Sequence, residues 1–142
     1  MSEIKPSELC AELLEVVRAV TPYSKRTPRD VFQGRVGSQP QIAGDRYVQI
    51  VPTGSRRNGL LLDATTCDLS VDIEVYYKNT ADNWGRAVDD QALIASAVDE
   101  WITLGLYSVT IEAASVTLVQ DEIIQAVINV GLIYKLEATN GQ

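Results

Sequence analysis

The side chains that could do chemistry in this chain are two cysteines and a few adjacent carboxylates. The sequence contains no histidine, which excludes histidine acid–base catalysis, Ser-His and Cys-His nucleophile pairs and histidine-ligated metals. Cys10 and Cys67 stand far apart and outside any CxxC spacing, and two cysteines alone do not make a tetrahedral zinc site. We therefore expect two reduced thiols that pack as small hydrophobic residues.

Two other sequence patterns resemble ligand-binding or catalytic sites but have simpler explanations. Residues 54–59 have the outer glycine spacing of a phosphate-binding loop, but leucines occupy 60 and 61, where Lys and Ser or Thr are required. The carboxylate pairs at 89–90 and 121–122 fall at an expected helix cap and an expected turn. Aromatic residues make up 6% of the chain and are not interleaved with basic ones, which disfavours base stacking. The sequence thus predicts no enzyme, no metal and no cofactor.

Length and composition indicate one globular domain over residues 1–142. A chain of this length with 46% hydrophobic residues can bury about 68–70% of its unfolded surface without a disulfide or metal. The first six residues lack the basic start and apolar run of a signal peptide. The longest apolar stretch, 123–134, is interrupted by Gln125 and Asn129 and is too short to span a bilayer. We expect no membrane contact and synthesis in a reducing cytoplasm.

The net charge of −7 is unevenly distributed: residues 21–60 carry +5 and the rest of the chain carries −12. Residues 21–45 show no periodicity and are punctuated by three prolines and three glycines, so we expect a long, mobile basic loop that orders on assembly. Lys25, Arg26 and Arg29 in this loop are candidate interface residues. The alternative is ordinary solvated charge.

Hydrophobic spacing predicts two helices. Leu9, Leu13 and Val17 follow a 3.6-residue period, which predicts a helix over 8–20. A second helix is expected over 90–104, capped by Asp89 or Asp90 after a loop at 79–87.

Alternation of apolar and polar residues predicts the strands, most clearly over 66–77 and again over 107–119 and 124–136. A short strand is expected over 47–51, followed by turns at 52–59, where Pro-Thr-Gly and Asn-Gly occur. The fold class is therefore α+β, with a mostly antiparallel sheet of four to five strands flanked by two helices.

Two of the predicted strands have a face whose side chains are unusual for a surface exposed to solvent. The polar face of the 66–77 strand has a run of three acids, Asp68, Asp72 and Glu74. The second face of the last strand is half apolar, with Ile123, Val127 and Ile133. Because large exposed apolar patches are rare on monomers, we expect a helix or a neighbouring subunit to cover these three side chains.

The element order, size, acidity and lack of catalytic groups, with the short motif from Arg46-Tyr47-Val48 to Val51-Pro52, resemble the tail terminator, or tail completion, proteins of long-tailed bacteriophages. The resemblance implies a hexameric ring that caps the tail tube, stops its polymerisation and joins the tail to the head or neck. It implies as partners the chain itself, the major tail tube protein and a head-completion or neck protein. The implied location is the tail-neck junction of the virion.

The resemblance also implies that DNA passes through the ring without sequence-specific binding. A basic lumen would hold DNA through counterion release, whereas an acidic lumen would let it slide. Asp68, Asp72 and Glu74 are therefore candidate lumen residues, and an outer solvated sheet face is the alternative. The competing functions are a head-closure, neck-connector or tail-tube-like protein, and a small ligand-binding α+β domain outside phages.

Arg56 and Arg57 are expected in a mobile turn that docks onto the tube or a neighbouring subunit. Replacing both with Glu should leave the melting temperature nearly unchanged but impair ring assembly or tail completion, because rim charges act on association more than on folding. Thermal melting and electron microscopy of tails measure the two effects. Normal assembly by the double variant would contradict the prediction.

Overall fold

The computed structural model describes residues 4–20, 34–37, 46–57, 66–119 and 122–135. The elements in chain order are α1 (Pro6–Arg18), β1 (Gly34–Val36), β2 (Arg46–Arg57), β3 (Thr66–Lys78), α2 (Ala81–Asp99), β4 (Leu106–Val119) and β5 (Ile123–Lys135). This is the α+β fold predicted from the sequence. No helix in the described ranges has the length and apolar character needed to cross a membrane.

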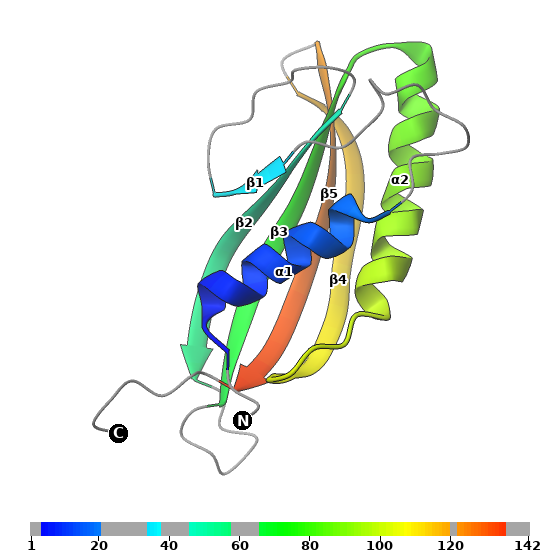
Figure 1. Ribbon diagram of the computed structural model, residues 1–142. Helices are drawn as coiled ribbons and strands as arrows, with labels where there is room; N and C mark the ends of the chain where they lie inside the picture. Colours follow the sequence, from blue (N-terminus) through cyan, green and yellow to red (C-terminus); the bar gives the residue numbers. More distant parts are fainter. Residues whose placement is uncertain (1–3, 21–33, 38–45, 58–65, 120–121, 136–142) are drawn as a thin grey trace.

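The five strands form one sheet in the order β1-β2-β3-β5-β4, in which β1 runs parallel to β2 and all other neighbours are antiparallel. α1 contacts β1 and β2, whereas α2 contacts β3, β4 and β5. Both helices contribute to one hydrophobic core, and Figure 1 shows them against the curved sheet. The sheet thus has a helix-covered face and a second face, which we call the open face.

The alternating pattern of the sequence decides which side chains reach the core. Ile73 of β3 lies opposite Ile128 of β5, and Val71 lies opposite Val130. All four are buried in the core cluster. Because side chains alternate along a strand, the intervening residues of both strands project onto the open face.

The second helix begins earlier than the sequence suggested. α2 starts at Ala81, and the Thr80 hydroxyl caps it by accepting a hydrogen bond from the Asn83 N–H at 3.1 Å. Trp84 is therefore helical, and the loop expected at 79–87 was wrong from residue 81 on. The expected capping role of Asp89 or Asp90 was also wrong, because both lie inside the helix.

β2 is longer than expected. The turn region predicted over 52–59 was wrong at 52–57, and residues 58–59 lie outside the described residues. The strand continues to Arg57 through a register shift between Pro52 and Gly54, where a bulge absorbs the irregular sequence. Arg56 and Arg57 therefore lie in a strand and not in a turn. β4 likewise has a register shift between Ile111 and Ala113, where a bulge interrupts its pairing with β5.

The loop expected over 21–45 contains the short strand β1. Apart from residues 34–37, it lies outside the described residues, and so do Lys25, Arg26 and Arg29. The structure therefore does not test their interface role.

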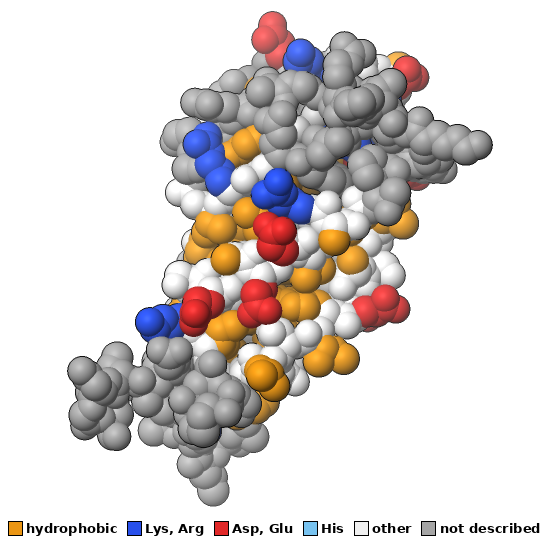
Figure 2. Space-filling model, viewed as in Figure 1, with side chains coloured by type: hydrophobic (Ala, Val, Ile, Leu, Met, Phe, Trp, Pro, Cys, Tyr) orange, Lys and Arg blue, Asp and Glu red, His pale blue; other side chains and the backbone are white. Residues whose placement is uncertain are grey.

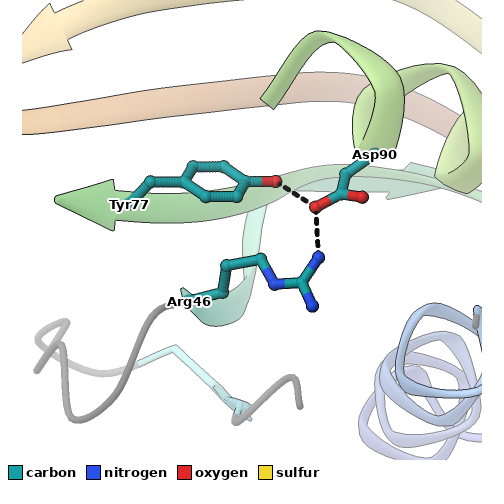
Figure 3. A network of polar contacts seen from close by, with 3 residues as sticks. All are labelled: Arg46, Tyr77 and Asp90. Atoms are coloured by element: carbon teal, nitrogen blue, oxygen red, sulfur yellow. Dashed lines mark hydrogen bonds and ion pairs between the residues drawn. The ribbon is translucent and has the colours of Figure 1, made fainter. Parts of the chain in front are cut away.

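A buried ion pair joins α2 to the sheet (Figure 3). Arg46 Nη1 of β2 lies 2.6 Å from Asp90 Oδ2 of α2, and both side chains are fully buried. The Tyr77 hydroxyl of β3 donates a hydrogen bond to the same carboxylate oxygen at 2.9 Å. One carboxylate thus fixes one helix relative to two strands.

Removing this carboxylate should destabilise the fold strongly. Asp90→Ala leaves the Arg46 guanidinium buried without its counter-charge, so we expect the free energy of unfolding to fall by about 3–5 kcal/mol. The matched control is Asp89→Ala at the exposed neighbouring position, expected to change it by no more than about 0.5 kcal/mol. Urea unfolding measures both, and equal effects would contradict a buried ion pair.

Candidate interaction surface

The open face of the sheet is not packed against a described helix, and β3 supplies three of its acidic side chains. Figure 2 shows the opposite side of the molecule, viewed as in Figure 1 with α1 in front of the sheet. Asp68, Asp72 and Glu74 all project onto the open face and are half-buried. Across β5 they lie opposite Ile133, Asn129 and Val127 respectively. The structure therefore places the three candidate lumen residues on one continuous surface.

Two of these carboxylates are engaged by neighbouring strands. Asp72 accepts a hydrogen bond from the Asn129 amide of β5. Glu74 Oε1 accepts one from Gln49 Nε2 at 3.3 Å and one from the Tyr76 hydroxyl at 2.7 Å. These two carboxylates are therefore held in place by hydrogen bonds within the sheet.

A tyrosine cluster closes one end of this acidic row. Gln125 Nε2 donates to the Tyr76 hydroxyl at 3.0 Å. The ring centroid of Tyr47 lies 6.5 Å from that of Tyr76. Arg35 of β1 stacks over the Tyr47 ring, with its guanidinium carbon 5.6 Å from the centroid, and its Nε donates to the Tyr47 hydroxyl. The cluster links four strands across the open face, and the sequence did not reveal it because its partners come from separate strands.

Burial and the contact with Glu74 alter the chemistry of this cluster. Burial is the larger cause, followed by the hydrogen bond to Glu74, and together they raise the pKa of Tyr76 to about 12. The phenol remains neutral at physiological pH and can keep donating to the carboxylate.

A hollow lies near the opposite end of the open face. One row of small side chains crosses the sheet there, because Gly54 pairs with Ser70, Ser70 with Gly131, and Gly131 with Thr110. The hollow has a volume of about 510 Å³, and Asp68 and Glu112 are among the residues that line it. A methyl group on Gly131 would lie 3.0 Å from Glu112 Oε2, so the glycine leaves room for that carboxylate.

The half-apolar side of β5 also lies on the open face. Ile123, Val127 and Ile133 are half-buried, yet both helices pack on the opposite face. The expectation that a helix covers these side chains was therefore wrong. Strict alternation sends the other residues of β5 to the helices, and cover by a neighbouring subunit stays a prediction.

The remaining candidates for chemistry are the two cysteines and possible metal ligands. Cys10 and Cys67 are buried and unlinked, and burial raises the pKa of the Cys10 thiol. In the described ranges, no group of three or more His, Cys, Asp or Glu side chains is arranged to hold a metal. The open face therefore offers half-buried carboxylates for contact with another surface, and the side chains of Tyr47, Gln49 and Tyr76 beside them are buried.

Comparison with known proteins gives a likeness in fold. No protein family model matches the chain, and no curated protein matches its sequence. A chain in the solved structure described as "Virion of native gene transfer agent (GTA) particle" is similar over 88% of this chain and 85% of that chain. The TM-score is 0.51 at 15% sequence identity. The two chains share their fold over almost their whole length.

The pKa of Tyr76 predicts a loss of stability in alkali. Because the folded-state pKa of about 12 exceeds the ordinary value of about 10, the stabilisation is complete below pH 10 and is lost as pH rises from 10 to 12. Tyr76→Phe has no ionisable group there, so its free energy of unfolding should fall less steeply over this range. Urea titrations at several pH values measure the slopes, with exposed Tyr107→Phe as control. Identical slopes for Tyr76→Phe and the unaltered chain would contradict the assignment.

Proposed function

We propose that this chain is a structural subunit of a phage-type virion and, within it, a tail terminator. Six copies form a ring that caps the tail tube, stops its polymerisation and joins the tail to the head or neck. The observation that carries the proposal is the shared fold with a chain of a gene transfer agent virion over 88% of this chain. The role is structural and needs no catalytic group or cofactor.

The charge distribution supports a ring around DNA. Asp68, Asp72 and Glu74 lie on the open face, and the net charge is −7. In the proposed ring the open face lines the channel, where carboxylates repel phosphates and let DNA slide. The basic segment 21–45 then serves protein partners. A reconstruction with these three acids on the outer circumference of the ring would refute this orientation.

Tail length distinguishes a terminator from the alternatives. Particles made without this chain should carry tubes of uncontrolled length, and purified chain added during assembly should restore uniform tails joined to heads. Negative-stain electron microscopy measures both tail length and attachment.

Each alternative has its own outcome in the same experiment. Tails of normal length that fail to join heads would indicate a neck or head-closure protein. Absence of any tube would indicate a tail-tube protein, and unchanged particles would indicate a domain outside the virion.

A further inference from the structure

The outer edge of β4 is unusually open for a natural sheet. β4 is the last strand in the sheet order, and no described strand pairs with its outer side. It spans 14 residues without a proline, and Glu112 is its one charged residue. Long edges of low charge invite pairing with another strand, and natural proteins usually block them with Lys, Pro or a cover. The two register shifts in β4 are its main irregularities.

Large exposed apolar side chains are concentrated in one stretch of the described chain that includes β4. Eight large hydrophobic residues are exposed in the described part of the chain, and seven of them fall between Trp84 and Leu118, in α2, β4 and the loop between them. Ile102 is 91% exposed and Leu104 is 74% exposed. Four of the seven, Ile102, Leu104, Tyr107 and Leu118, lie in β4 or in the segment just before it.

The opposite edge of the sheet is also incomplete. β1 pairs with β2 at three positions, Val48 to Ile50. Beyond them, the second half of β2 has no described partner on its outer side, and residues 52–55 are exposed. Pro52 lacks an N–H, so donors for a further strand are available only after it, over 53–57.

The two incomplete edges lie at the same level of the sheet. Gly54 of β2 and Thr110 of β4 end one row of paired residues that crosses all four antiparallel strands. The pairings β2–β3, β3–β5 and β5–β4 are all antiparallel, so β4 runs in the direction opposite to β2. If adjacent copies stand side by side in the same orientation, β4 of one copy therefore meets β2 of the next in antiparallel orientation. The edges also differ in charge, since β4 carries Glu112 and β2 ends with two arginines.

We propose that β4 of one copy pairs with residues 53–57 of β2 in the next copy, so that the sheet continues across the subunit boundary. This inference rests on the proposed ring and names the surfaces that build it. The contact is head-to-tail, because it joins two different edges of the chain. Gly54 and Thr110 end the same row of paired residues, so successive copies can close into a ring without a rise along its axis. An offset between the two edges along that axis would instead produce a filament. The apolar side chains beside β4 are then buried at the boundary.

Paired cysteines test this arrangement in assembled particles. Gly54 projects onto the open face, and no atom lies within 4 Å of the position that a methyl group on it would take. Gly54→Cys is therefore combined in turn with Ser108→Cys, Thr110→Cys and Ala113→Cys on the same face of β4. Oxidation of purified particles should give a ladder of covalent oligomers with at least one of the three pairs. Denaturing gels measure the ladder.

The matched control is Ser55→Cys with Thr110→Cys. Ser55 pairs with Leu69, so it projects to the helix-covered face and should give no ladder with Thr110→Cys. Dimers from Thr110→Cys alone would show β4 pairing with β4 and overturn the proposal. Particles that keep a ring at the tail end but give no ladder would overturn the strand pairing and leave the proposed function intact. If particles made with the unsubstituted chain do not contain it at the tail end, both the strand pairing and the proposed function would be overturned.

Discussion

The buried contact between Arg46 and Asp90 is the constraint on which the rest of the structure depends. A charge removed from water must meet its counter-charge, so α2 can lie against the sheet in one rotation about its axis. Ile94 and Val98 follow Asp90 at intervals of four residues and enter the core on the same face. The same rotation leaves Trp84 and Val88 on the outside. The ion pair thus sets both what is buried and what remains for contact with other proteins.

The sequence predicted the elements whose signal is local and missed those that depend on distant residues. Strict alternation predicted β3 and β5 because one face of each packs on the helices. Asp90 was interpreted as a helix cap, since nothing near it in the sequence shows that it meets Arg46, 44 residues away. Pro52 suggested a turn, but at a sheet edge its missing N–H removes no pairing within the described strands.

The sequence predicted which acidic residues share the candidate surface, but it did not predict their hydrogen-bond partners. The sequence placed three acids on one strand face, and the register confirms that they share it. Their hydrogen bonds come from Gln49 and Asn129 on separate strands, so they depend on register and could not be predicted from one strand alone. The sequence also did not show that no helix packs over Ile123. A hydrophobic pattern indicates that a face of a strand needs to be covered, but it does not indicate which element covers it.

The division of each strand into two alternating sets of residues has an evolutionary consequence. Residues facing the helices determine whether the chain folds, whereas those on the open face contribute little to the core. Mutations can therefore accumulate on the open face and follow a changing partner while the architecture persists. A chain of this architecture would therefore drift in sequence long before it drifts in shape.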